Sequence, residues 1–234
     1  MGIDPRSARA GVVVGLEAEA RIARRLGLPV EIGGGGAAGA ETAAARLVAA
    51  GARGLISFGL CGGLMPGLKA GALLVPGAIL HEDGSRHQTD AELNAWLGGA
   101  TPHVMLAATR IVSRAAEKSE RWQATGATAV DLESGAVARA AVRHGLPYAC
   151  LRAVCDIAED DLPAAAIVSL DSAGRIRIGA VVWSVISQPG QLGALIALAA
   201  NAAAARQTLK NRVRRVGALP PQAFQLAEGG EQSP

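Results

Sequence analysis

Apolar, strand-like runs alternate with alanine-rich, helix-like stretches along most of this chain of 234 residues. Runs such as residues 53–58 and 147–154 are typical of buried strands, and segments with helical periodicity stand between such runs. This alternation is characteristic of α/β proteins, in which helices cover a mostly parallel or mixed sheet. We therefore expect a single α/β domain with a central mixed β-sheet flanked by helices.

The predicted strands span residues 11–16, 29–32, 53–58, 72–80, 103–108 and 147–154, and a brief strand ends at Val130. The predicted helices span residues 18–26, 40–50, 91–96, 114–122, 134–144 and 191–213. No linker divides the chain, so residues 1–217 are expected to form one domain. Residues 218–234 are rich in Pro, Gly, Gln and Glu and are expected to be a disordered tail.

The composition argues against a nucleic-acid partner. The net charge is only +3 and aromatic residues make up 3%, whereas nucleic-acid binders usually carry a dense basic face with aromatic platforms. Basic residues cluster only at residues 210–215. A solvated helix end explains this cluster most simply, and a peripheral contact with anionic lipid is the alternative.

Cysteine and histidine usage predicts neither disulfides nor a metal. Three cysteines form no CxxC pair, which indicates a reducing compartment, and the four histidines lack the spacing of zinc ligands. No uninterrupted apolar run reaches the roughly 18–20 residues that span a bilayer, and no secretory signal is evident at the N-terminus. We expect a cytoplasmic protein without a metal or a resident cofactor.

Two acidic segments lie 22 residues apart: VDLES at residues 130–134 opens a helix-like stretch, and RAVCD at residues 152–156 ends a strand-like run. Carboxylates at the ends of adjacent elements of an α/β unit can meet in one pocket. One can bind a sugar hydroxyl while the other holds a proton for a leaving base. A nucleoside-cleaving enzyme is therefore the first hypothesis, although helix capping would also account for either acidic segment.

Two further segments follow predicted strands. Glu17 and Glu19 come after the first strand, where the helix dipole alone would favour them. The glycine-rich residues 59–63 include Cys61 and Gly62, and they predict either a plain tight turn or a backbone that presents N–H groups to a ligand.

Residues 34–39 match the dinucleotide fingerprint G-x-G-x-x-G between a strand and a helix. The acidic residue expected at the end of the next strand is missing, because that strand ends at Ser57 and Phe58. This departure argues against NAD binding. A binding module that holds a nucleoside or dinucleotide without catalysis remains an alternative class.

Five ordered segments together resemble the family of purine nucleoside phosphorylases and methylthioadenosine/S-adenosylhomocysteine nucleosidases. They are residues 12–19, 51–64, 68–75, 129–133 and 152–156. The resemblance implies that Asp156 protonates or hydrogen-bonds the purine N7, and that Glu19 activates water. It implies a substrate-binding set of Glu133, Leu132, Asp131, Cys61, Gly62, Ile111 and Arg152. Within this set Glu133 would hold ribose hydroxyls, Leu132 would pack beneath the sugar, and Ile111 would stand near the position of a purine-stacking aromatic residue.

The chain departs from the phosphorylases at the phosphate site. Ser57 and Leu60 occupy the positions where that family places an arginine and a serine, although Arg21, Arg24 or Arg110 could compensate. Phosphate is therefore an optional co-substrate, and the sequence leaves phosphorolysis and hydrolysis open. Members of the family are commonly dimers or larger, so we expect a homo-oligomer.

The C-terminal third resembles the hopanoid-associated branch of this family, on residues 160–163, 170–175 and 188–192. The resemblance implies adenosylhopane as the substrate, with adenine released during hopanoid biosynthesis, and the short span between residues 80 and 104 implies an open 5′ side of the ribose pocket. Candidate walls for the hydrocarbon, or a membrane-facing patch, are Val181, Val182, Trp183, Val185 and Ile186. The alternative is a generic purine nucleosidase or phosphorylase acting on small nucleosides such as methylthioadenosine.

Overall fold

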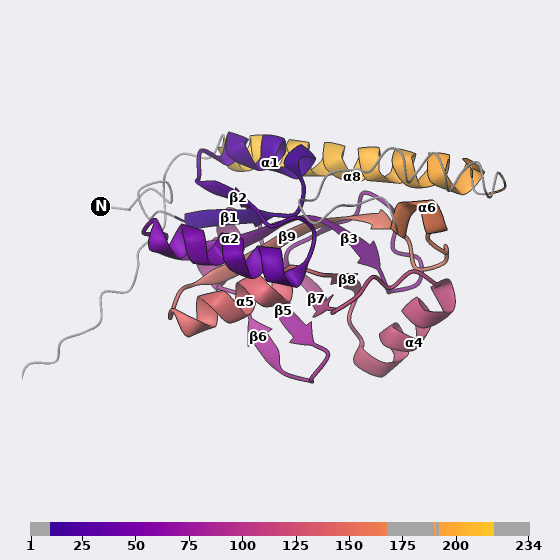
Figure 1. Ribbon diagram of the computed structural model, residues 1–234, viewed down its shortest axis with the longest axis horizontal. Helices are drawn as coiled ribbons and strands as arrows, with labels where there is room; N and C mark the ends of the chain where they lie inside the picture. The colour runs from indigo at the N-terminus through magenta and orange to yellow at the C-terminus, as the bar shows by residue number, and fades with distance from the viewer. Residues whose placement is uncertain (1–9, 168–189, 191, 218–234) are drawn as a thin grey trace, which may run out of the picture.

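The computed structural model describes residues 10–167, 190 and 192–217 (Figure 1). The strands are β1 (Ala10–Val14), β2 (Val30–Ile32), β3 (Gly54–Gly63), β4 (Leu73–Leu74), β5 (Pro76–His81), β6 (Arg86–Gln88), β7 (Thr101–Ala107), β8 (Ala129–Asp131) and β9 (Tyr148–Asp156). The helices are α1 (Glu17–Ala23), the 3₁₀ turn η1 (Arg24–Leu26), α2 (Ala37–Ala49), α3 (Ala91–Trp96), α4 (Ala115–Thr125), α5 (Ser134–Arg143), α6 (Ala164–Ile167) and α8 (Leu192–Gly217).

The strands form one mixed sheet in the order β2-β1-β3-β8-β7-β5-β6, with β9 pairing to both β3 and β4. The pairs β1–β3, β3–β9, β7–β8 and β5–β7 are parallel, whereas β3–β8, β4–β9 and β5–β6 are antiparallel. The predicted α/β class with a central mixed sheet is therefore confirmed.

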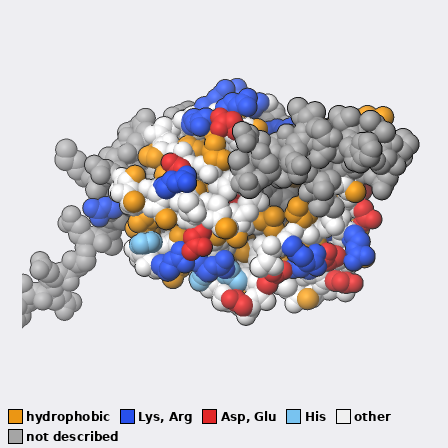
Figure 2. Space-filling view, viewed as in Figure 1, with side chains coloured by type: hydrophobic (Ala, Val, Ile, Leu, Met, Phe, Trp, Pro, Cys, Tyr) orange, Lys and Arg blue, Asp and Glu red, His pale blue; other side chains and the backbone are white. Residues whose placement is uncertain are grey.

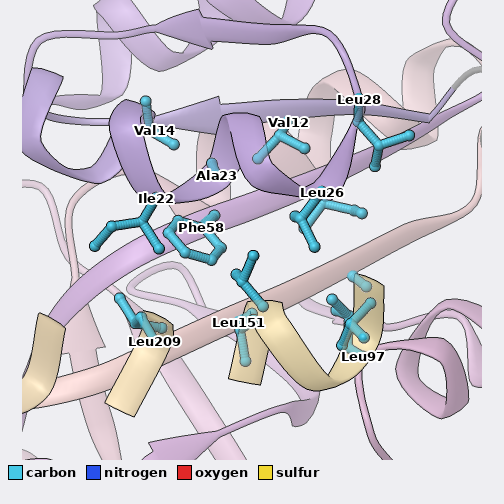
Figure 3. Packing of buried hydrophobic residues seen from close by; sticks show 14 of the residues in the cluster. Val12, Val14, Ile22, Ala23, Leu26, Leu28, Phe58, Leu97, Leu151 and Leu209 are labelled. Carbon is cyan, nitrogen blue, oxygen red and sulfur yellow. The ribbon is translucent and has the colours of Figure 1, made fainter. Parts of the chain in front are cut away.

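Helices cover both faces of the sheet, with α1 and α8 on one side and α2 and α5 on the other (Figure 1). Consecutive residues of β1 serve the two layers, because side chains alternate across a strand: Val12 and Val14 join the first core, and Val13 joins the second. Figure 3 shows the first core, where Ile22 of α1 and Leu209 of α8 lie near Phe58 of β3.

Small residues form the second layer. Ala40, Ala43 and Ala44 of α2 are buried together with Ala138 and Ala141 of α5. Alanine side chains let helices and strands approach closely, so the chain builds a substantial core although it contains few aromatic residues.

Three predictions about elements were wrong. The strand predicted at residues 72–80 is two strands, because β4 pairs with β9 while β5 pairs with β7. For residues 59–63 the sequence left open a tight turn or a backbone that presents N–H groups to a ligand. The turn is wrong, because the segment continues β3 and its Leu60 and Cys61 pair with Ala153 and Val154. Asp131, predicted to begin a helix, ends β8, and α5 begins at Ser134.

The region between β5 and β7 contains the helix α3 at its predicted residues 91–96, and the strand β6, which was not predicted. The predicted tail at residues 218–234 and the candidate apolar walls at residues 181–186 lie outside the described residues. None of the described helices is both long enough and apolar enough to cross a membrane. On the face shown in Figure 2, basic and acidic side chains of the described residues are intermixed.

Candidate active site

The carboxyl end of β3 brings the two acidic segments together. Gly62 pairs with Val130 of β8 on one side and with Asp156 of β9 on the other. A larger residue than glycine at position 62 would require its neighbours to move slightly. An added Cβ would lie 3.3 Å from Oδ2 of Asp156 and 3.4 Å from Cγ1 of Val130. The predicted meeting of the two segments is therefore a consequence of β3 pairing with both neighbours.

Arg152 is the centre of a buried ionic cluster. Only 1% of this residue is exposed. Its Nη2 lies 2.7 Å from Oδ2 of Asp131 and 3.1 Å from Oε2 of Glu133, and it donates a hydrogen bond of 2.7 Å to Oγ of Ser57. Burial by itself would lower the pKa of Arg152, but the facing carboxylates raise it well above its usual value. Arg152 is thus a permanent cation between two acidic side chains.

Glu19 lies beside this cluster and accepts three backbone hydrogen bonds. Its Oε2 accepts from the N–H groups of Gly15 and Leu16 at 3.0 and 2.9 Å, and its Oε1 accepts from Leu60 at 2.9 Å. Burial raises the pKa of Glu19, while Arg152 and these N–H groups act in the opposite direction. Glu19 therefore caps the start of α1, as the helix dipole favours, and also belongs to the buried cluster.

Glu133 lies against Gly15, whose N–H group binds Glu19. An added Cβ on Gly15 would lie 2.2 Å from Oε1 of Glu133, so the backbone just after β1 and the carboxylate are in close contact. Burial raises the pKa of Glu133 to about 7 against the effect of Arg152, and the negative charges of Glu19 and Asp131 add to the rise. A carboxyl group of this kind exchanges protons near neutral pH.

Asp131 has a structural role in this cluster. Its Oδ1 accepts hydrogen bonds from the backbone N–H and the hydroxyl of Ser134, at 3.2 and 2.6 Å, and so caps α5. Its Oδ2 forms the ion pair with Arg152. Because both oxygens are engaged by the protein, Asp131 orients Arg152 and the start of α5.

Asp156 is buried in a separate ion pair. Nζ of Lys118, a residue of α4 with no exposed surface, lies 2.8 Å from Oδ2 of Asp156. Burial raises the pKa of Asp156 to about 6, Lys118 opposes this rise, and Asp160 adds to it. Lys118 was not among the predicted site residues, because it lies among charged residues of α4. Its spacing of four from the partly buried Trp122 was the available signal.

The remaining predicted residues differ in their positions. Leu132 is partly buried beside a cavity of about 400 Å³, whose lining combines small residues such as Ala107 and Ala136 with the polar side chains of His81, Glu82, Asp83 and Arg139. Cys61 packs in the second core, where burial raises the pKa of its thiol well above the usual value. Ile111 is partly exposed in the loop between β7 and α4, and no described contact joins it to the carboxylates.

The glycines of the dinucleotide-like motif serve the packing of α2. An added Cβ on Gly39 would lie 1.6 Å from the carbonyl oxygen of Gly33, so α2 crosses the end of β2 at a distance that excludes a side chain. Gly34 and Gly35 both have a φ of 81°, in the left-handed region that favours glycine. The packing at Gly39 and these backbone angles account for three of the glycines without a dinucleotide.

Carboxylates gathered around a buried arginine near the ends of strands are typical of an enzyme active site. The family model described as the phosphorylase superfamily matches residues 30–105 and 99–187. The chain belongs to the phosphorylase superfamily, and the prediction of an enzyme acting on nucleosides is confirmed. No curated protein matches the chain in sequence.

Solved structures share the fold at low sequence identity. A methylthioadenosine/S-adenosylhomocysteine nucleosidase of Helicobacter pylori is 17% identical, with a TM-score of 0.63 over 92% of this chain and 100% of that one. A futalosine hydrolase mutant of the same organism is 18% identical, with a TM-score of 0.59 over 76% and 98%. The methylthioadenosine/S-adenosylhomocysteine nucleosidase of Neisseria meningitidis is 18% identical, with a TM-score of 0.58 over 86% and 98%.

Proposed function

We propose that this enzyme cleaves the N-glycosidic bond of an adenosyl compound with water and releases adenine. The observation that carries the proposal is the buried cluster in which Glu19 and Glu133 lie beside Arg152. Cleavage of an N-glycosidic bond develops positive charge on the ribose, and buried carboxylates stabilise such charge.

Asp156 is the proposed general acid. Protonation of N7 lets the base leave as neutral adenine, and general acid catalysis is worth roughly 10²–10⁴ in rate. With a pKa of about 6, Asp156 holds a proton in a useful fraction of molecules near neutral pH. Its ordinary value of 3.8 would leave almost none.

Glu133 and Glu19 take the two remaining roles. Oε2 of Glu133 is held by Arg152, whereas Oε1 lies against Gly15, which has no side chain, and is the oxygen proposed to accept a hydrogen bond from a ribose hydroxyl. Oε1 of Glu19 accepts one backbone N–H and has a second lone pair, with which it can accept a proton from the attacking water. The three N–H groups fix its carboxylate for this task.

Hydrolysis is favoured over phosphorolysis by the pairing of the cations. Among the described residues both buried cations, Arg152 and Lys118, already face carboxylates. The guanidinium groups of Arg24 and Arg110 are exposed and pair with Glu17 and Glu117. Arg21 is exposed. Phosphate would therefore find no unneutralised buried cation in the part of the chain that is described.

The 5′ substituent is proposed to be large and apolar, with adenosylhopane as the candidate. The sequence resemblance supports this identity. The short segment between β5 and β7 supports the space for it. Burial of a polycyclic hydrocarbon contributes about 25 cal/mol per Å² of apolar surface.

The test is adenine release from adenosylhopane in detergent, with and without phosphate, beside methylthioadenosine. We expect release from adenosylhopane that phosphate does not change. Release mainly from methylthioadenosine would assign the generic nucleosidase, and a requirement for phosphate would assign phosphorolysis. Release from neither substrate would refute the catalytic roles.

A matched pair of variants tests the water-activating role. Glu19→Gln removes the buried carboxylate, and Glu17→Gln removes an exposed one two residues away that pairs with Arg24. We expect a decrease in kcat of about 10² or more for the first variant. The second should retain the parent activity, and equal losses in both would contradict a catalytic role of Glu19.

Two partner predictions accompany the function. We expect a symmetric homo-oligomer, commonly a dimer, which the mass measured by light scattering would reveal. A peripheral contact with anionic lipid would suit a lipid substrate, and Leu192 and Ile196 of α8 expose 52% and 62% of their surface. Flotation with anionic and neutral vesicles would test this contact.

A further inference from the structure

Lys118 is a fully buried lysine whose three N–H donors all have acceptors. Its Nζ lies 2.8 Å from Oδ2 of Asp156 and donates to the carbonyl oxygens of Ile157 and Asp160, both at 2.7 Å. An ammonium group has three donors and no acceptor, so this geometry uses its full capacity. The cation is therefore fixed in the turn that follows β9.

Two more bonds tie this turn to the beginning of α4. The backbone N–H of Ala115 donates to Oδ1 of Asp161 at 2.6 Å, and that of Leu162 donates to Ser113 O at 2.7 Å. Hydrogen bonds and the ion pair thus connect α4 and the residues just before it to residues 156–162 along the whole length of this turn. The place of the Asp156 carboxyl depends on α4 as well as on its own strand.

Lys118 is the cation that acts on Asp156 in the described part of the chain. The acidic groups around the pair are Asp160, which raises the pKa of Asp156, and Glu159, which feels the positive charge of Lys118. The neighbouring Cys155 has a pKa raised to about 12 by burial and by Asp156, so its thiol is neutral. Removal of Lys118 would leave burial and Asp160 to act on Asp156 unopposed.

We propose that Lys118 is the positioning residue for Asp156: it holds Oδ2 in place and controls the proton on that carboxyl through each turnover. This role rests on the proposed function. Asp156 gives its proton to N7 as the C1′–N9 bond breaks and the bond's electron pair passes to the base. Water then adds to C1′ and gives a proton to Glu19. The ammonium of Lys118 stabilises the Asp156 carboxylate until solvent returns the proton.

The activity test uses the pH dependence of kcat/KM in three variants. Lys118→Met removes the buried charge, Asp161→Asn weakens the tie to α4 while leaving the ion pair, and Lys69→Met removes an exposed lysine that acts on Glu159. We expect Lys118→Met to lower kcat at least tenfold and to move the basic limb upward by about one pH unit or more. Asp161→Asn should lower kcat with an unmoved limb, and Lys69→Met should change neither.

A basic limb that stays in place in Lys118→Met would overturn the proposal, because a purely structural role lowers the rate without moving the profile. A titration without substrate separates this failure from failure of the proposed function. Aspartate labelled with ¹³C at the carboxyl gives the midpoint of Asp156, assigned by its loss in Asp156→Asn. The midpoint should be higher in Lys118→Met than in the parent, whether or not adenine is released, and an equal midpoint would refute the role.

Should Lys118→Met not fold, Lys118→Gln keeps N–H donors without the charge and serves in the same titration. The parent protein offers a further measurement, the ¹⁵N–¹H signal of the Lys118 ammonium. We expect this signal to be protected from solvent exchange and to shift with pH as Asp156 titrates. A signal that does not respond through that range would overturn the proposal.

Discussion

Glu133 should lower the stability of the folded protein at neutral pH, and Glu133→Gln should remove this effect. The pKa of Glu133 is raised by burial from 4.5 to about 7. A carboxyl that binds its proton more tightly when folded favours the folded state below pH 4.5, and this contribution is lost as pH rises through about 7. The difference in pKa corresponds to about 3 kcal/mol.

Glutamine stays neutral at every pH, so the stability of the variant does not decrease as pH rises through about 7. The free energy of unfolding of Glu133→Gln, minus that of the parent, should rise by about 2–3 kcal/mol between pH 5 and pH 8. The lost contact with Arg152 adds an offset of opposite sign that does not depend strongly on pH. Arg152 keeps Asp131 and Ser57 as partners, so the variant should fold.

Urea unfolding at pH 5 and pH 8 measures the difference, with Glu17→Gln as the control because Glu17 is exposed and pairs with Arg24. The control should change little between the two pH values. Activity should fall by about 10²–10³ in Glu133→Gln, because a neutral amide stabilises the ribosyl cation poorly. A stability difference that is flat with pH would refute the assignment of Glu133 as a desolvated carboxyl.

Gly59→Ala should destabilise the protein by about 1–3 kcal/mol and lower kcat, because its Cβ would lie 2.5 Å from Nη1 of Arg152 and 2.6 Å from Oε1 of Glu19. Urea unfolding beside Gly77→Ala, where no atom lies within 4 Å, checks this, and equal effects would contradict it. Arg152→Met should cost about 3–5 kcal/mol at pH 8, because buried carboxylates lose their cation, and less at pH 5, where they can take up protons; a loss that is equal at the two pH values would count against it. For the parent enzyme, kcat/KM should be highest between about pH 6 and pH 7, because Asp156, with a pKa of about 6, must hold its proton while Glu133, with a pKa of about 7, must be ionised, and it should fall at higher pH. Asp156→Asn should abolish this fall, and a rate that is constant from pH 5 to pH 8 would exclude Asp156 as the acid.

The positions of the proposed catalytic residues could be predicted because they follow from local pattern. Glu19 and Asp156 each lie at or after the end of an apolar strand. In an open α/β sheet, ligands bind beyond the carboxyl ends of the strands, so polar side chains at those ends approach one another. The fold class followed from the same alternation of elements.

The roles inside the cluster could not be predicted from local pattern, because they depend on pairing between distant strands. Asp131 looked like a helix-starting acid, and it does cap α5, but its second oxygen is held by Arg152, which β3 brings to the same place. The glycines at residues 59–63 suggested a turn. They continue a strand because both of its neighbours supply backbone partners.

The α/β architecture and the placement of Glu19, Glu133 and Asp156 near strand ends follow from the sequence alone, because the alternating pattern and the strand ends are properties of short segments. Which charges are neutralised depends instead on contacts between segments that are distant in the sequence. Lys118 finds carbonyl acceptors 39 and 42 residues away along the chain. A lysine on a charged helix is predicted to be exposed to solvent unless its acceptors are known. Burial of its charge is tolerated only where groups distant in the sequence accept its hydrogen bonds.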